Sequence, residues 1–356
     1  MSKNLLSIKP YGIKKTILQD KPLVSVIILN WNGEKYLKDC FVSLENQTYP
    51  NLEILLADNG SEDNSIRFIK ENFPWVKIIE NKKNLGFAEG NNRGIKIAKG
   101  KYIFILNNDT KTDKNCLEKL IEIAEKDNRI GMCAPKIVSF KNPQIIDSLG
   151  INIYFDGMSR GRKRTKIDKG QYNQIEEILL PSACAALYRK RMLDEIGLFD
   201  KDFFAYCEDT DLGLRGRLAG WKAFLIPSAI VSPHYSGTVG KYSDFKAFLV
   251  ERNHFWVALK NFPLSLILLL PFYTTLRYFF LIYGILTHQG PAAEFQSSKF
   301  KLFPVLIKAY ISTLKGMPLI LKKRKLIQKN KKLTNKEIYN LFKKNSLKIS
   351  ELTLKD

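Results

Sequence analysis

A carboxylate closes one of the most apolar stretches of the sequence. Tyr102 to Leu106 is a run of five apolar residues, and Asn107, Asn108 and Asp109 follow it directly. A short apolar run rich in β-branched and aromatic residues is typical of a core strand in a parallel sheet. Ligands of open α/β sheets bind at the carboxyl ends of such strands, so Asp109 stands where chemistry usually takes place. The alternative is that Asp109 only caps a following helix.

A second group of acids lies further along the chain, between aromatic residues. The stretch FFAYCEDTDL contains Glu208, Asp209 and Asp211. Carboxylates this close repel one another and tend to raise each other's pKa, which suits a general base or a cation site. The alternative is the first turn of a helix, where acids interact favourably with the helix dipole.

Polar residues at two other predicted strand ends could bind a nucleotide. The apolar run Leu23 to Asn30 leads into Trp31, and the run Leu52 to Asp58 ends in a carboxylate. On one edge of a sheet these residues would bind a nucleotide, with Asp58 accepting a hydrogen bond from a pyrimidine N3–H. The alternative is that Asp58 only forms part of the turn DNGS, which needs no function. The segment NLGFAEGNNRGI adds glycines that permit close backbone approach, and Arg93 for a phosphate or base.

Strands and helices alternate through this part of the chain. Apolar residues at helical spacing follow the predicted strands in the segments 36–44, 65–73, 88–98 and 117–124. Strands alternating with helices of this length indicate βαβ units and a parallel sheet. A further strand is predicted at 132–140, whereas the Gly- and Arg-rich segment 147–170 has no pattern that predicts a structure. The predicted fold class is α/β.

The composition bounds the kind of protein. The 356 residues allow about two domains, and 45% hydrophobic residues suffice for a core. Five scattered cysteines without a CxxC pair argue against a disulfide framework or a zinc site. The net charge of +22 is concentrated near the end, where 16 Lys or Arg residues and three acids lie between Lys299 and Asp356. Such a segment attracts anionic lipid or nucleic acid.

An apolar stretch before this basic segment suggests a membrane. Apolar residues at helical spacing from Phe245 predict a long amphipathic helix, which leads to Leu264–Leu286, where Arg277 is the only charge. The stretch is long enough for a span, but Pro271 and Arg277 interrupt it, and a single span would place the basic tail against the positive-inside tendency. We therefore expect interfacial helices on the cytoplasmic face, with lysines on anionic headgroups. A membrane-entering hairpin that returns through 303–321 and a soluble helical domain are the alternatives.

Together and in this order, the segments resemble glycosyltransferase family 2, most closely its bacterial rhamnosyltransferase-like branch. They are VSVIILNWNG, DNGS, NLGFAEGNNRGI, LNNDT, the stretch from Ser182 to Asp200, FFAYCEDTDLGLR and PHYSG. The resemblance covers residues 23 to 260. It implies a GT-A fold with a mostly parallel central sheet, a nucleotide-sugar donor, a divalent cation and inverting transfer to an acceptor hydroxyl.

The resemblance also implies residue roles. LNNDT matches the family's metal-binding Asp-x-Asp-like motif, so Asp109 would hold Mg²⁺ or Mn²⁺ against the donor diphosphate. His234, one of three histidines and on its own more often structural, matches a metal-binding histidine of some relatives. Asp209 matches the catalytic base, and Glu208 would position the acceptor or the base. The expected donor-binding residues are Asn30, Trp31, Asp58, Asn84, Gly86, Arg93, Asn107 and Asn108, and the expected acceptor-side residues are Ser182, Ala183, Arg215 and Trp221.

The expected organisation has four parts. They are an N-terminal lead (1–22), a GT-A domain (23–260), a membrane-associated helical region (261–325) and a Lys-rich tail (326–356). The expected donor is dTDP-rhamnose, with UDP-galactofuranose and UDP-N-acetylglucosamine as alternatives, and the expected acceptor is a polyprenyl-linked or polysaccharide glycan. The sequence leaves the oligomeric state open.

Two rival functions come from other classes. A nucleic-acid-binding protein would use the basic tail, but Asp58, Asp109 and Asp209 at the predicted strand ends would repel phosphate, so we expect no nucleic-acid partner. An inactive membrane scaffold is suggested by the motif NND, in which Asp109 is the only carboxylate.

Overall fold

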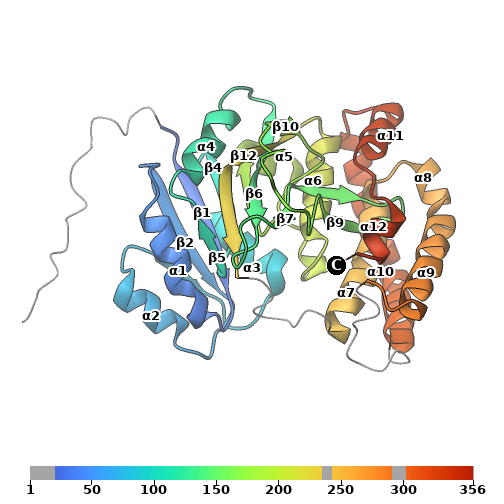
Figure 1. Cartoon of the computed structure of the whole chain (residues 1–356), viewed down its shortest axis with the longest axis horizontal. Helices are drawn as coiled ribbons and strands as arrows, with labels where there is room; N and C mark the ends of the chain where they lie inside the picture. Colours follow the sequence, from blue (N-terminus) through green and yellow to red (C-terminus); the bar gives the residue numbers. More distant parts are fainter. Residues whose placement is uncertain (1–20, 235–242, 291–301, 356) are drawn as a thin grey trace, which may run out of the picture.

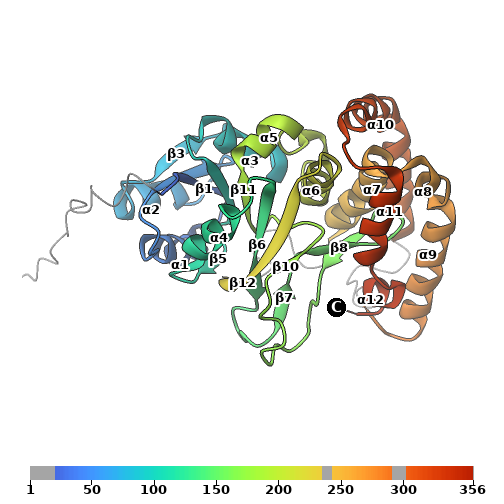
Figure 2. The same cartoon turned by 90° about the horizontal axis from the view of Figure 1, so that it is seen from above.

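A computed structural model describes residues 21–234, 243–290 and 302–355. Most of the predicted N-terminal lead lies outside the described residues, as do Tyr235, Ser236 and Gly237 of the PHYSG segment. A sheet flanked by helices forms one part of the molecule, and the C-terminal helices gather at its other end (Figure 1; Figure 2, turned by 90°).

The apolar runs predicted as strands form the centre of one sheet. Within the described ranges it has ten strands, in the order β10-β12-β6-β11-β4-β1-β2-β3, with β5 on β12 and β7 on β6. The strands are β1 (Val24–Asn30), β2 (Leu52–Asp58), β3 (Lys77–Glu80), β4 (Tyr102–Asn107), β5 (Thr110–Thr112), β6 (Ile130–Val138), β7 (Ile146–Ser148), β10 (Glu176–Glu177), β11 (Ala185–Arg189) and β12 (Lys222–Pro233).

The prediction of a mostly parallel sheet is confirmed at its centre. Strands β1 to β4 are parallel where they pair, and so are β6 and β12. Strand β11 departs from this pattern because it runs antiparallel between β4 and β6. Two strands, β8 (Ile151–Ile153) and β9 (Ser159–Gly161), form a separate hairpin within the segment for which no structure was predicted.

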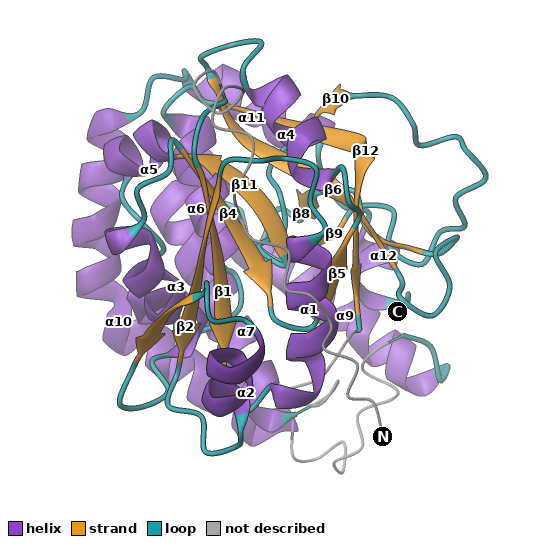
Figure 3. Ribbon diagram, turned by 90° about the vertical axis from the view of Figure 1, so that its left-hand side faces the viewer, coloured by secondary structure: helices purple, strands orange, loops and turns teal. Residues whose placement is uncertain are grey.

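Helices cover both faces of the sheet, which explains why its strands are apolar throughout (Figure 3). One apolar cluster contains residues of α1 (Glu34–Glu45), α2 (Ser65–Asn72) and α4 (Cys116–Ala124). A second contains residues of α3 (Gly86–Ile97), α5 (Lys190–Ile196) and α6 (Glu208–Leu218). The helices predicted from periodicity are therefore present, with ends that differ by a few residues.

The C-terminal helices pack onto the sheet domain through a third apolar cluster. They are α7 (Asp244–Asn261), α8 (Leu264–Leu268), α9 (Leu270–Leu286), α10 (Leu302–Asn330), α11 (Asn335–Lys344) and α12 (Ile349–Thr353). The cluster joins Phe203 and Leu214 to Trp256 of α7, Ile320 of α10 and Phe342 of α11. Residues from the predicted Lys-rich tail therefore take part in the core.

The apolar stretch Leu264–Leu286 is not one continuous helix. It is divided at Leu269 into α8 and the 17-residue α9. The charge that interrupts it, Arg277, is 1% exposed and lies between Asp156 and Glu251. Within the described part of the chain, the helix whose length and composition would allow it to cross a membrane is instead α10, from Phe303 to Asn330.

Candidate active site

The carboxyl ends of three neighbouring strands meet as predicted. Asn30 of β1 lies opposite Asp58 of β2, and Leu29 lies opposite Asn107 of β4. Side chains link these ends, because the Asn30 amide donates to Asp58 Oδ2 at 2.9 Å and the Asn108 amide donates to Asn30 Oδ1 at 2.7 Å. In this arrangement Asn108 acts as a donor to a neighbouring strand. A carboxylate at the same position would place two acceptors together.

The Asp58 carboxylate is held by the protein itself. Its Oδ1 accepts the Ser61 N–H at 2.8 Å, and its Oδ2 accepts the Ser61 hydroxyl at 2.6 Å. The side chain is buried, whereas Trp31 beside it is 37% exposed. A base placed against this edge would therefore meet the indole of Trp31 more readily than the carboxylate of Asp58.

Three of the predicted donor-binding residues, Asn84, Gly86 and Arg93, lie at or near the start of α3. Asn84 Oδ1 accepts the Gly86 N–H at 2.8 Å, so Asn84 fixes the start of the helix. Gly86 has a φ of 77°, and a Cβ there would lie 2.5 Å from the carbonyl oxygen of Phe204, so glycine is required. Arg93 lies two turns into α3, is exposed and pairs with Glu89 at 3.1 Å, so its contact with the donor stays a prediction.

Asp109 and His234 come together as predicted. Their backbones are linked, since the His234 N–H donates to the Asp109 carbonyl at 2.7 Å. Asp109 Oδ1 is buried and has no hydrogen-bond partner among the described residues, and burial raises the pKa of this carboxyl. The His234 ring stacks on Phe140, and its Nε2 lies 3.0 Å from Asp39 Oδ2. Asp39 was not predicted, because nothing in the sequence of α1 relates it to a histidine 195 residues later.

The predicted base lies at the first turn of α6. Asp209 Oδ1 accepts the Thr210 N–H at 2.7 Å, and Oδ2 accepts the Ala183 N–H at 3.2 Å. The next residue, Cys184, accepts the Asn107 N–H at 2.9 Å through its carbonyl oxygen. The segment Ser182 to Cys184 therefore joins α6 to the end of β4. It brings Asp209 to the strand end that precedes Asp109, which the order of residues in the sequence does not reveal.

Burial shapes the electrostatics of this pair of acids. Burial raises the pKa of Asp209, although hydrogen bonds from Ala183 and Thr210 oppose the effect. Burial, and then the charge of Asp209, raise the pKa of Glu208 well above its usual range. Glu208 Oε2 also has no hydrogen-bond partner in the described part of the chain. The fold therefore favours the protonated form of both carboxyls more than water does.

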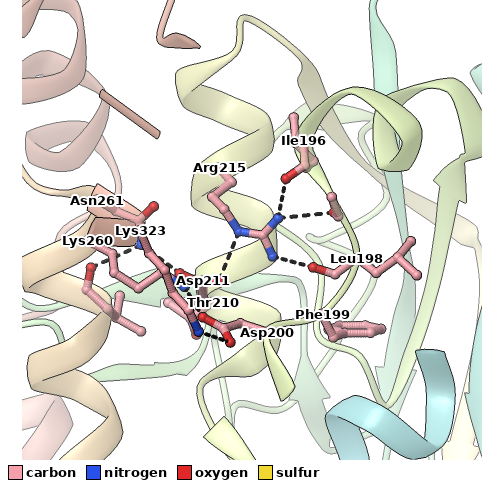
Figure 4. A network of polar contacts seen from close by, with 12 residues as sticks. Ile196, Leu198, Phe199, Asp200, Thr210, Asp211, Arg215, Lys260, Asn261 and Lys323 are labelled. Atoms are coloured by element: carbon pink, nitrogen blue, oxygen red, sulfur yellow. Dashed lines mark hydrogen bonds and ion pairs between the residues drawn. The ribbon is translucent and has the colours of Figure 1, made fainter. Parts of the chain in front are cut away.

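Two predicted acceptor-side residues lie outside the site. The Arg215 guanidinium is buried, pairs with Asp211 at 2.9 Å and donates to the carbonyls of residues 196 to 198 (Figure 4). Trp221 precedes the amino end of β12, whereas His234 follows its carboxyl end, and its indole N–H donates to Glu195 at 3.1 Å. Both residues are structural, and both predictions are corrected.

Residues 25–197 match the family model described as Glycosyl transferase family 2. This chain contains a glycosyltransferase family 2 domain. The predicted resemblance is therefore confirmed. The matched residues include the three strand ends, Asp109 and Ala183, whereas Asp209 and His234 lie beyond them.

Two relatives bear the name of the activity. An uncharacterized glycosyltransferase of Haemophilus influenzae is 36% identical over 116 residues, which cover 32% of this chain and 36% of the relative. An N-acetylglucosaminyl-diphospho-decaprenol L-rhamnosyltransferase of Mycobacterium tuberculosis is 24% identical over 265 residues, 66% of this chain and 86% of the relative. This chain spans between 36% and 62% of the length of the first relatives it matches.

Solved structures agree on the fold. The mannosyltransferase PcManGT of Pyrobaculum calidifontis, in complex with GDP-Man and Mn²⁺, is similar with a TM-score of 0.52 and 16% identity. The match covers 83% of this chain and 88% of that one. The glycosyltransferase domain accordingly has the GT-A-like α/β fold that the sequence predicts.

Proposed function

We propose that this protein transfers a sugar from a nucleotide-diphosphate donor to an acceptor hydroxyl, with inversion at the anomeric carbon and Asp209 as the base. The observation that carries the proposal is the link through Ser182 to Cys184, which brings Asp209 to the end of the strand that leads to Asp109. In an inverting transfer the base and the donor diphosphate lie on opposite sides of the reacting carbon. One acid therefore has to face the acceptor while the other faces the donor.

The residues present fit a divalent cation with the donor diphosphate. The described residues hold no group of three or more His, Cys, Asp or Glu side chains that could enclose a metal by themselves. Asp109 has a buried oxygen without a partner, which suits a hard cation that takes further oxygens from phosphate. Asp39 would orient the ring of His234, as carboxylates do for metal-binding histidines. When bound, Mg²⁺ or Mn²⁺ would neutralise charge on the leaving diphosphate.

Asp209 is arranged to accept a proton from the acceptor. The Ala183 and Thr210 N–H groups hold its carboxylate in one orientation, and the side chain is partly exposed. A raised pKa brings the pKa of the carboxyl nearer to the pH at which the enzyme works, which favours general-base catalysis. Glu208 lies deeper and would share charge or a proton with Asp209.

The acceptor class is inferred from the surroundings of the base. Ser159 of β9 hydrogen bonds to Thr210 at 2.8 Å, so the β8–β9 hairpin borders the first turn of α6. The hairpin and the turn after it carry Arg160, Arg162, Lys163 and Arg164. Arg162 pairs with Glu176 at 3.1 Å and Arg164 lies 3.9 Å from Asp147, so four basic residues and two acids leave a net positive charge here. Together with the name of the Mycobacterium relative, this charge supports an anionic acceptor such as a polyprenyl-diphosphate-linked glycan. The same name supports dTDP-rhamnose as the first donor to test, before UDP-galactofuranose and UDP-N-acetylglucosamine.

A donor-binding experiment tests the proposal. Calorimetry with a panel of nucleotide sugars, with and without Mg²⁺ or Mn²⁺, is expected to give metal-dependent binding of one donor to the wild-type protein. Asp109→Ala should weaken that binding at least about 10- to 100-fold, because the cation loses a carboxylate ligand. The exposed Asp194→Ala on α5 is the matched control and should bind as the wild type does.

Other results would favour other functions. Binding of a donor that is equally strong without metal and in Asp109→Ala would contradict the role of Asp109. Failure of every donor to bind, in a protein that is folded, would favour the inactive scaffold.

We also propose that α8, α9 and α10 bind the cytoplasmic face of a membrane that contains anionic lipids. The distribution of polar residues on α9 is the reverse of that on a helix of a soluble protein, because its charged residue Arg277 faces the protein and its outer face is apolar. Helices α9 and α10 are in contact, because Tyr310 donates to the Tyr278 hydroxyl at 3.0 Å. The exposed apolar side chains of this surface are Leu264, Leu268, Phe272, Phe279, Ile282, Leu286, Phe303, Ile307, Ile311, Leu314 and Leu321.

Charge complementarity points to anionic lipid as the partner. Lys308, Lys315 and Lys322 recur every seven residues of α10, so they form one exposed row beside the apolar residues of the same helix. An apolar stripe with lysines along its edge is typical of helices that lie in the headgroup region.

Vesicle binding tests this part. Leu314→Glu should reduce co-sedimentation with vesicles that contain phosphatidylglycerol at least about tenfold, because a charge would replace an apolar side chain that we expect to enter the lipid. The matched control is Ile167→Glu, since Ile167 is 54% exposed but lies on the sheet domain. Equal binding by both variants, or equal binding of the wild type to neutral vesicles, would overturn the assignment of this surface.

A further inference from the structure

The segment from Asp200 to Cys207 leads directly into the base and has an unusual backbone. Phe204, Tyr206 and Cys207 have φ values of 65°, 69° and 65°, in the left-handed region that side chains other than glycine rarely occupy. Such conformations persist only where the surrounding structure imposes them. Since Glu208 and Asp209 follow at once, whatever imposes this conformation also determines where the base lies.

Helix α7 holds the segment through its backbone. The Asn253 amide nitrogen lies 3.0, 2.9 and 2.7 Å from the carbonyl oxygens of Phe203, Ala205 and Tyr206. Arg252 adds contacts of 3.1 and 3.0 Å to the carbonyls of Asp202 and Phe203. Asn253 is fully buried. One side chain of α7 thus collects three carbonyls of the strained segment, a contact that no local sequence pattern requires.

Ion pairs from α7 and α10 hold the start of the same segment (Figure 4). Lys260 Nζ lies 2.6 Å from Asp200 Oδ2 and 2.8 Å from Asp211 Oδ1. Lys323 Nζ lies 2.5 Å from Asp200 Oδ1 and 2.5 Å from Asp202 Oδ2. Lys260 is buried, whereas the Lys323 side chain is 25% exposed. The two lysines join both C-terminal helices to the segment and, through Asp211, to the catalytic helix itself.

The other side of the segment touches the donor side of the site. Phe204 accepts the Ala88 N–H at 3.1 Å through its carbonyl oxygen, and Gly86 lies against the same residue. The segment is therefore held between the start of α3 and the C-terminal helices. A shift of the segment would move Asp209 relative to the bound donor.

We infer that Asn253, Lys260 and Lys323 are positioning residues for the base, and that α10 supports the catalytic segment from the membrane side through Lys323. The inference rests on the proposed function, since it assigns to Asp209 the role of the base. It gives the C-terminal helices a part in turnover in addition to lipid binding. Lys323 is the most informative position, because its partial exposure makes a neutral substitution compatible with folding.

Turnover of Lys323→Met is the first measurement. We expect kcat to fall about 10- to 100-fold, as for a base displaced by a fraction of an ångström to one ångström. Metal-dependent donor binding should stay within about twofold, because the ion pairs of Lys323 are with Asp200 and Asp202, whereas Asp109, Asn30 and Trp31 are expected to meet the donor. Lys323→Arg should recover most of the turnover, since it keeps the charge. Lys336→Met, an exposed lysine on α11, is the matched control and should behave as the wild type.

Hydrogen exchange gives a second readout that does not depend on activity. Lys323→Met should accelerate exchange of the amides from residues 202 to 209 and leave those of β1 and β4 unchanged. Unchanged kcat in Lys323→Met would overturn the inference. A parallel loss of kcat, donor binding and thermal midpoint would also overturn it, because Lys323 would then be structural only. If the wild type itself transfers no sugar, the proposed function fails, and unchanged exchange at 202 to 209 would separately reject the positioning role.

Discussion

Asp209→Asn is expected to lower kcat about 10²- to 10⁴-fold while donor binding remains. Asparagine keeps one oxygen, which can accept the Ala183 N–H and so hold the segment 182–184, whereas the hydrogen bond from the Thr210 N–H is lost to the amide NH2 group. It cannot take a proton from the acceptor hydroxyl, so the attack loses its base. Turnover with a lipid-linked acceptor measures the first effect, and calorimetry with the donor and Mn²⁺ measures the second.

The control for this variant separates chemistry from folding. Asp194→Asn removes a carboxyl from the surface of α5 and should leave both turnover and donor binding unchanged. Full activity in Asp209→Asn would remove the assignment of the base. Loss of donor binding together with turnover would mean that Asp209 supports the donor side instead.

The pH dependence of stability gives an independent check on the same side chain. Burial raises the pKa of Asp209 and of Glu208, so between the ordinary and the raised values the folded protein binds more protons than the unfolded chain. The stabilisation that these two groups contribute to the folded protein is therefore present at low pH, and it is lost as the pH rises through the raised pKa. Asp209→Asn should flatten this fall, and its thermal midpoint at about pH 8 should equal or exceed that of the wild type.

The strands and their polar ends were predictable for a simple reason. A parallel strand covered on both faces must be apolar throughout, so VSVIILN, LEILLAD and YIFILN are recognisable without any partner. The carboxyl ends of parallel neighbours necessarily share one edge. Hence Asn30, Asp58 and Asn107 could be placed together from the sequence alone.

The errors concern side chains whose partners are distant in the chain. Arg215 follows Glu208, Asp209 and Asp211 in the sequence, and the resemblance placed it on the acceptor side. Its partners are carbonyls from residues 196 to 198, which only the packing of α6 against that loop brings near. Trp221 was likewise judged by its closeness in sequence to α6, whereas the chain reversal into β12 places it at the far end of a strand from His234.

Strand β11 was missed because its surroundings, and not its own residues, decide its direction. Ala185–Arg189 is short and carries no signal that distinguishes an antiparallel strand from a buried loop. It matters for the site, since the segment before it connects Asn107 to Asp209. No sequence pattern could therefore predict that Asp209 lies near the strand end that precedes Asp109.

Arg277 is another side chain whose partners could not be predicted from the sequence. In the sequence this residue is a charge inside an apolar stretch, and its cost in a bilayer argues against a span. The structure provides the partners, Asp156 and Glu251, which lie 121 and 26 residues away. The two acids and the arginine together fasten α9 to α7 and to the loop after β8. The stretch is apolar on the outside because its charge is neutralised on the inside.

Arg277→Met is accordingly expected to destabilise the protein by about 3 to 5 kcal/mol, because it leaves Asp156 and Glu251 buried without their partner. The guanidinium makes contacts of 2.6 Å to Asp156 and of 2.8 and 3.0 Å to Glu251, and all three side chains are buried. Denaturant unfolding measures the change. Arg67→Met, which breaks the exposed pair with Glu71 at 2.8 Å, should leave the midpoint nearly unchanged.

The outcome for Arg277→Met also decides how the apolar stretch meets the bilayer. If α9 is docked as the ion pairs indicate, the loss of stability should appear equally in the presence and absence of vesicles, since Arg277 faces the protein in both. If the variant is as stable as the wild type, the buried contacts do not hold α9 in place. The stretch from Leu264 to Leu286 would then be free to insert as a hairpin with α10, and the surface we assign to the headgroup region would lie within the hydrocarbon core.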